Sequence, residues 1–117
     1  MSISEAEFSI MELIWANGGT MQAKDIAVSL NRSIALSATT VYTMISRLIK
    51  KDVIRRVDPG FYCTATISKD EVMQKDTDHL ITKLYDGSVY DLILYCIRTD
   101  RLSENEKIRL KRLVKDL

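Results

Sequence analysis

Along the first fifty residues, apolar side chains recur every three or four positions in three successive stretches, the spacing of one buried helix face. The first predicted helix begins at Ser4, which forms a capping-box pattern with Glu7. It ends at Asn17-Gly18-Gly19, because glycine accepts the left-handed conformation at a helix C-terminus. A second helix is predicted over residues 22–32, after an extended Thr20-Met21 that is able to pair as a short strand. The inward residues of these two helices are Phe8, Met11, Ile14, Trp15, Ile26, Ala27 and Leu30.

The third stretch predicts a helix over residues 37–51 whose two faces differ in polarity. Ser37 is its natural N-cap. The buried face is expected to contain Val41, Met44, Ile45, Leu48 and Ile49. The opposite face carries Thr39, Thr43, Ser46 and Lys50, flanked by Tyr42 and Arg47. Such a face suits a DNA major groove, where hydroxyl groups reach base edges or phosphates, although a merely solvated helix face is the alternative interpretation.

The apolar period then changes to that of extended chain. Residues 53–57 and 61–67 are rich in β-branched and aromatic side chains, and they flank Asp58-Pro59-Gly60, a strong turn signal. The two runs therefore predict a β-hairpin. Three helices followed by a two-stranded hairpin form a winged helix, and this order favours DNA binding by the helix over 37–51.

The charge pattern supports the same interpretation. The formal net charge is only +1, so any DNA contact requires a local concentration of cations. Such a cluster lies between residues 47 and 56, where a single acid, Asp52, is present. Its cations are Arg47, Lys50, Lys51, Arg55 and Arg56. Residues 68–117 instead balance six lysines and four arginines against seven aspartates and three glutamates, which indicates a neutral segment facing a partner or solvent.

Three more helices are predicted in this neutral segment, which makes the fold mainly α with a small β-hairpin. Ser68 with Glu71 and Ser103 with Glu106 are capping-box patterns, and Asp86-Gly87 breaks the chain between them. About fifty residues cannot bury so many apolar side chains alone, so a homodimer is expected. The expected dimerisation residues are Leu80, Ile81, Leu84, Leu92, Ile93, Cys96, Leu110, Leu113 and Val114. The predicted domains are a winged helix over 1–67 and a helical dimerisation domain over 68–117.

Other function classes find little support in the sequence. No apolar run approaches the roughly 18 residues that a membrane span needs, so no membrane contact and a cytoplasmic location are expected. Cys63 and Cys96 lack paired spacing and are interpreted as small buried apolar residues, and His79 has no nearby ligands, so no metal or cofactor is expected. An enzyme is not expected, because there is no nucleophile with a base at suggestive spacing and no glycine-rich phosphate loop.

Several stretches together resemble the penicillinase-repressor family, the winged-helix transcriptional repressors of the BlaI, MecI and CopY type. They are Ser4-Glu5-Ala6-Glu7 with Met11 and Ile14-Trp15; Thr39-Thr40-Val41-Tyr42-Thr43 with Arg47-Leu48 and Lys50-Lys51; and Leu84-Tyr85-Asp86-Gly87 with Leu92-Ile93-Leu94 and Leu102-Ser103. The resemblance implies a homodimeric repressor that binds a palindromic operator in double-stranded DNA and controls an antibiotic-resistance or metal-homeostasis operon. A winged-helix module that binds another protein is the alternative function.

The resemblance also implies roles for individual residues. Thr39, Thr40, Tyr42 and Thr43 would read bases or grip phosphate, and Arg47, Lys50, Arg55 and Arg56 would contact or attract the backbone. Ser37, Ser46 and Lys51 complete the predicted DNA-binding set. Helix packing is the competing role for Thr40, and a solvated strand face is the competing role for Arg56.

Two departures from the family limit what the resemblance implies about induction. Tyr95-Cys96 stands where β-lactam-responsive members carry the Asn-Phe bond that an induced protease cleaves. Whether an inducing protease acts on this chain is therefore left open. The paired Cys-x-Cys motifs of copper-responsive members do not occur between Ile97 and Leu117, so copper sensing lacks its thiolate ligands there.

Overall fold

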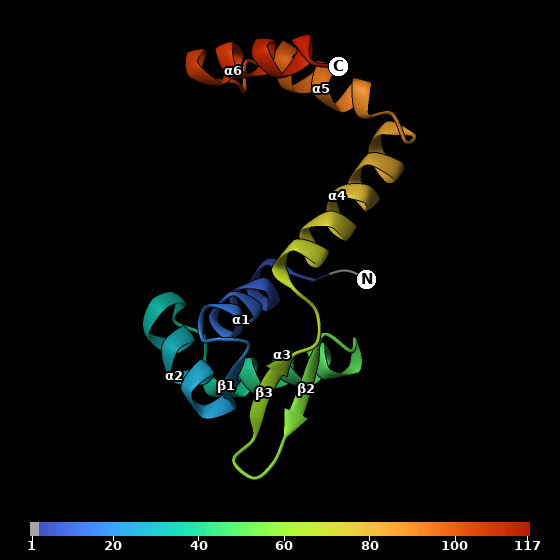
Figure 1. Ribbon diagram of the computed structural model, residues 1–117. Coiled ribbons are helices and arrows are strands. Elements are labelled where there is room, and N and C mark those ends of the chain that lie inside the picture. The colour runs from blue at the N-terminus through green and yellow to red at the C-terminus, as the bar shows by residue number, and fades with distance from the viewer. Residues whose placement is uncertain (1–2) are drawn as a thin grey trace. The chain divides into compact units, whose positions relative to one another are not determined.

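The computed structural model describes residues 3–117 and divides the chain into two compact units, Met1–Asp76 and Thr77–Leu117. The first unit contains three helices and a three-stranded antiparallel sheet (Figure 1). Its elements are α1 (Glu5–Ala16), β1 (Thr20–Gln22), α2 (Ala23–Ile34), α3 (Ala38–Lys50), β2 (Ile54–Val57) and β3 (Tyr62–Ala65). They are followed by α4 (Lys69–Tyr85), α5 (Val89–Arg98) and α6 (Glu104–Lys115), and the boundary between the units falls inside α4. The predicted mainly α winged-helix fold is confirmed.

Local signals start and end these helices as the sequence predicts. Ser4 and Glu7 form the expected capping box on α1, and Ser37 accepts a hydrogen bond from the backbone amide of Thr40 at the start of α3. The N-terminus of α2 is held differently, because its Gln22 cap makes no side-chain bond. The backbone amide of Ala23 instead donates to the carbonyl oxygen of Phe61 at 3.0 Å, so the hairpin itself caps α2.

The core of the first unit combines one face of each helix with the sheet. The predicted inward residues Met11, Ile14, Ile26, Ala27, Leu30, Val41, Met44, Ile45 and Leu48 are all buried. Trp15 and Ile49 are only partly buried at the edge of this core, and Phe8 is half-buried with its ring 5.6 Å from that of Trp15. At this edge the Trp15 indole Nε1 donates to the carbonyl oxygen of Ile67 at 2.9 Å, and this bond joins α1 to the segment before α4.

The sheet has one strand more than the predicted hairpin. Its order is β1-β3-β2, so Met21 and Arg56 flank Cys63 on the central strand. The prediction that Thr20-Met21 can pair as a strand is confirmed. Cys63 is fully buried, as expected, and burial raises the pKa of its thiol to about 11 against the opposing effect of Arg56. The same prediction is wrong for Cys96, which is only partly buried because α5 has no buried face. Figure 1 shows the loop between β2 and β3 extending beyond the three helices as a wing.

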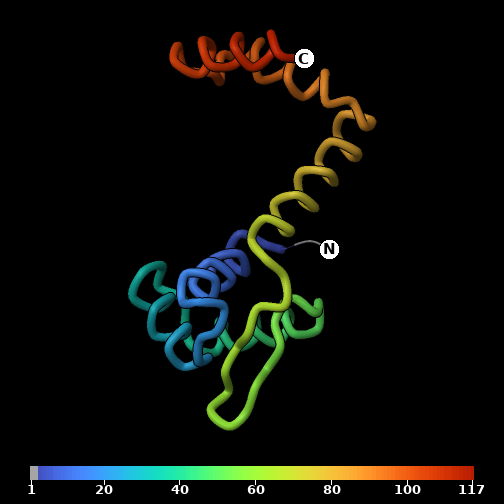
Figure 2. Tube along the Cα trace, in the orientation of Figure 1, coloured from blue at the N-terminus to red at the C-terminus, as the bar shows by residue number. Residues whose placement is uncertain are grey.

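The beginning of α4 belongs to the first unit. The trace in Figure 2 passes from β3 through a short connection into α4. Ser68 and Glu71 hydrogen-bond reciprocally at this start, as predicted, and Val72 is buried. Lys69 also lies 3.8 Å from Glu12 of α1. The first turn of α4 is therefore packed against the first unit.

The second unit is less enclosed. Neither α5 nor α6 contains a fully buried residue, although α6 begins with the predicted capping box of Ser103 and Glu106. An aromatic contact between Tyr85 and Tyr95, with ring centroids 6.4 Å apart, joins α4 to α5, and Arg101 donates to the hydroxyl of Tyr95. Among residues 3–117, no helix has the length and apolarity needed to cross a membrane, and no group of three or more metal-ligating side chains gathers.

Candidate nucleic-acid interface

The exposed face of α3 carries the side chains that the sequence analysis assigned to it. Thr39, Thr43, Ser46, Arg47 and Lys50 are all exposed, while the opposite side of the helix is buried. With two basic residues and none acidic in its last turn, the helix presents cations at its C-terminal end. The face therefore offers hydroxyl groups along its length and positive charge at one end, which matches a DNA groove bordered by phosphates.

Three hydroxyls near the start of α3 already make hydrogen bonds within the helix. Ser37 donates to Thr40 Oγ1 at 2.9 Å while it caps the Thr40 amide, and Thr43 donates to the carbonyl oxygen of Thr39 at 3.0 Å. A hydroxyl that has donated its proton still has acceptor capacity. Thr43 is thus oriented as an acceptor toward solvent, and Ser37 and Thr40 primarily order the first turn of α3.

The wing brings two arginines to the same unit. Arg55 and Arg56 are both exposed on β2, which lies at the edge of the sheet. Arg56 Nε donates to Asp58 Oδ2 at 2.9 Å, and the guanidinium lies 3.7 Å from the centroid of the Phe61 ring. This is a cation–π arrangement. Two contacts therefore hold the Arg56 side chain, although it stays exposed on β2, so its alternative role on a solvated strand face is left open.

Phe61 joins the wing to α3, a role that the sequence analysis missed. Its ring meets that of Tyr42 edge to face, with centroids 5.8 Å apart. Its backbone φ is +50°, in the left-handed region that non-glycine residues seldom occupy, at a cost of roughly 1–3 kcal/mol. An aromatic residue directly after Pro59-Gly60 was the available sequence signal. The ring thus lies between Tyr42 of α3 and the wing cation Arg56.

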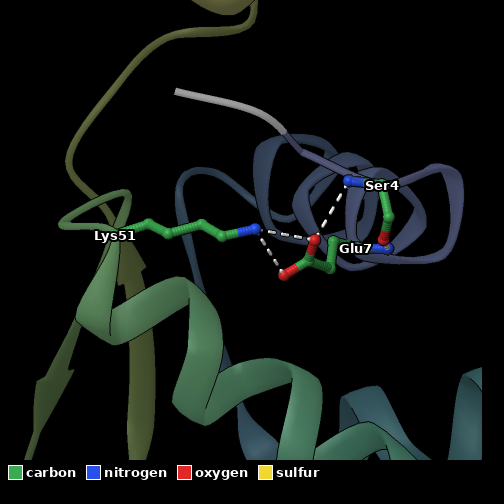
Figure 3. Close-up of polar contacts among 3 residues, drawn as sticks. All are labelled: Ser4, Glu7 and Lys51. Carbon is green, nitrogen blue, oxygen red and sulfur yellow. Dashed lines mark hydrogen bonds and ion pairs between the residues drawn. The ribbon is translucent and has the colours of Figure 1, made fainter.

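Lys51 has a different environment from the other cations of the cluster. Its ammonium lies 2.9 and 3.1 Å from the two carboxylate oxygens of Glu7, as Figure 3 shows together with the contact between Glu7 and the Ser4 amide. Glu7 is only 4% exposed, and the Lys51 side chain is one-third exposed. The sequence analysis assigned Lys51 to DNA from its place in the basic cluster. In the structure its ammonium joins the end of α3 to the start of α1.

The ionisation of Glu7 is set by opposing effects. Burial raises the pKa of this carboxyl, but hydrogen bonds from the Ser4 amide and the Lys51 ammonium outweigh burial, so the pKa lies below its usual value. Glu7 therefore completes a capping box and a partly buried ion pair at once. The capping box is readable from the sequence, whereas the ion pair joins residues 44 positions apart.

A shallow depression beside α3 adds two cations that the sequence analysis did not include. It has a volume of about 330 Å³ and lies between α2 and α3, next to Tyr42. Lys24 and Arg32 line it together with the half-exposed Val28. The positive surface around α3 thus extends onto α2, the element that precedes the recognition helix in a helix-turn-helix.

The comparisons with known proteins agree with this geometry. The sequence profile of the penicillinase repressor matches residues 3–116. The chain belongs to the penicillinase repressor family. The penicillinase repressor of Staphylococcus aureus is 28% identical, with 100% of this chain aligned to 94% of that protein. The methicillin resistance regulatory protein MecI of the same species is 27% identical over 96% of this chain and 92% of its own length.

A solved structure of a DNA-binding domain is similar to part of the chain. The solution structure of the DNA-binding domain of the repressor BlaI is similar with a TM-score of 0.55 and 29% identity, and the match covers 60% of this chain and 87% of that one. The protein is accordingly a DNA-binding transcriptional repressor of winged-helix fold. Its family is one of transcriptional regulators and not of enzymes.

Proposed function

We propose that the repressor acts as a homodimer that places two copies of α3 in the major groove of an inverted-repeat operator. The observation that carries this proposal is the exposed α3 face of hydroxyls and cations beside a wing with two arginines. Thr39, Tyr42 and Thr43 are assigned to base edges or phosphates. The cations Arg47, Lys50, Arg55 and Arg56 are assigned to the DNA backbone, and the ordered hydroxyls Ser37 and Thr40 are assigned to the start of α3.

The apolar surface of the second unit supports the dimer. Large apolar side chains are exposed on α5, on α6 and on the part of α4 that lies in this unit, and soluble monomers rarely expose large apolar patches. Five of the predicted dimerisation residues are exposed in this way, with exposed fractions between 39% and 66%: Leu80, Leu84, Ile93, Leu113 and Val114. A symmetric dimer presents two equivalent recognition helices, so its operator is expected to be palindromic.

Binding to duplex fragments from the repressor's own promoter region tests this proposal. We expect one fragment to be preferred over random duplex of equal length by about 10³-fold or more at moderate salt, the range of specific DNA-binding proteins. A chain that shows no preference for any fragment contradicts the proposal. The alternative of a protein-interaction module predicts that outcome.

Lys50→Glu is expected to weaken operator affinity about tenfold or more, because it replaces a cation that faces phosphate with a repelling anion. Fluorescence anisotropy titrations measure the effect. Lys75→Glu is the matched control, since it reverses an exposed lysine on α4. Equal losses for the two variants would mean that α3 has no special place in DNA binding.

An inducing protease is proposed as a partner only on the condition that α5 unwinds at the Tyr95-Cys96 bond. Tyr95 and Cys96 lie within α5 and are half-buried, and the carbonyl oxygen of Tyr95 accepts a hydrogen bond from the Thr99 hydroxyl at 2.7 Å. A protease needs extended chain, so cleavage at this bond requires α5 to unwind locally. The absence of a fully buried residue in α5 makes such unwinding less costly for the monomer.

A further inference from the structure

Asp58 lies in the turn of the wing and holds the guanidinium of Arg56. We propose that Asp58 is a specificity-determining residue that competes with DNA phosphates for Arg56. On the operator Arg56 contacts a phosphate, whereas on random duplex Arg56 stays paired with Asp58. The inference rests on the proposed function. It adds a role for an acidic residue that the DNA-binding set did not contain.

The carboxylate of Asp58 is fixed in the turn by both of its oxygens. Oδ2 accepts from Arg56 Nε at 2.9 Å, and Oδ1 accepts from the backbone amide of Phe61 at 3.2 Å. Because the second bond belongs to the turn itself, the negative charge stays at the wing when DNA approaches. A phosphate that takes Arg56 must therefore compete with a carboxylate already in position.

Arg56 is also held from its other side. The Phe61 ring lies against the guanidinium, contacts Tyr42 of α3, and is anchored by the bond from the Ala23 amide to the Phe61 carbonyl oxygen. Among the described residues, the contact with Asp58 uses only the Nε donor, and a guanidinium has five N–H donors. The remaining donors are thus kept at a fixed place relative to α3, but the adjacent Asp58 carboxylate repels a phosphate that approaches them until the ion pair is broken.

This ion pair is expected to contribute little to the free energy of unfolding. The side chains of Arg56 and Asp58 are 49% and 57% exposed, and ion pairs of such exposure contribute little to folding. Their effect is expected on binding instead. Random-duplex binding consists mainly of phosphate contacts in shifting registers, whereas base contacts by α3 fix one register on the operator. Only in that register is one phosphate held beside Arg56, so that its contact offsets the loss of the bond to Asp58.

Titrations of operator and random duplex at several salt concentrations test the inference. For Asp58→Asn we expect random-duplex affinity to rise about three- to tenfold and its salt slope to steepen by about 0.9 per protomer, since one more phosphate contact forms. The operator slope is expected to stay unchanged, because Arg56 already contacts phosphate there. The asparagine oxygen can still accept from the Phe61 amide, so an unchanged melting temperature verifies that the wing stays folded.

Asp76→Asn is the matched control, because it removes one exposed carboxylate from α4 with the same change in net charge. In an Arg56→Gln background, Asp58→Asn should change affinity no more than this control does. The inference is overturned if Asp58→Asn behaves like Asp76→Asn, or if operator and random duplex gain affinity by the same factor. A wild-type chain that prefers no duplex would instead overturn the proposed function, and this inference with it.

Discussion

Glu7→Gln is expected to lower the free energy of unfolding by about 2–3 kcal/mol, because it removes the negative charge that faces the partly buried Lys51 ammonium. Glu7 is nearly fully buried, and both of its oxygens face the ammonium at 2.9 and 3.1 Å. The cost stays below that of a fully buried pair because Lys51 retains one-third of its exposure. Urea denaturation followed by circular dichroism measures the loss.

Glu12→Gln provides the matched control for this variant. Glu12 lies on the same helix and has its own lysine, Lys69, but at 3.8 Å and with both side chains about half exposed. Its loss is expected to be within about 0.5 kcal/mol. Equal effects of the two substitutions would show that the ion pair of Glu7 and Lys51 is no more important than a surface contact.

The same carboxylate gives the folded protein a characteristic pH dependence. Its pKa is lower in the folded state than the ordinary value of 4.5, so its contribution to stability is present above about pH 4.5. That contribution is lost as the pH falls through the lower, folded-state pKa. Denaturation between neutral pH and pH 3 should therefore show a smaller loss of stability for Glu7→Gln than for the wild type. Parallel curves would contradict this assignment.

Truncation after Asp76 is expected to leave a folded monomer that binds the operator about 10²- to 10⁴-fold more weakly, because the two half-sites are no longer tethered. The cut lies beyond Val72, whose burial places the start of α4 in the first unit. Sedimentation velocity measures the oligomeric state, and anisotropy measures affinity for the operator and for one half-site.

Affinity for a single half-site controls for damage to the DNA-binding unit. It is expected to be nearly equal for the truncated chain and for one protomer of the full chain, since α3 and the wing are unchanged. A truncated chain with full operator affinity would remove the argument for dimerisation through residues 77–117. A truncated chain that still dimerises would place the interface in the first unit.

Local signals made much of this fold predictable. The capping pairs at Ser4 and Ser103 and the apolar period of α3 depend on residues within one or two turns of each other, so their spacing is sufficient evidence. The exposed face of α3 followed from the same period. Its assignment to DNA depended on the hairpin that comes next in the chain.

Tertiary contacts made the rest unpredictable. The prediction from the basic cluster gave all of its cations the same role. Lys51 instead meets a carboxylate on α1, and no local pattern predicts a contact across 44 residues. The Phe61 ring meets that of Tyr42, 19 positions earlier in the chain, from a left-handed backbone conformation that non-glycine residues seldom adopt. The pair of Arg56 and Asp58 is one that the sequence could have predicted, since the two residues are two positions apart at the start of the turn.

The indole of Trp15 gives the repressor a built-in optical reporter. The chain has a single tryptophan, and its Nε1 donates to the carbonyl oxygen of Ile67 just before α4 begins. Indole emission responds to the loss of such a bond and to entry of water. Intrinsic fluorescence therefore reports on the joint where the winged helix continues into α4, without any label. An inducer that loosens this joint will change the emission, whereas one that acts only within α5 and α6 will leave it constant.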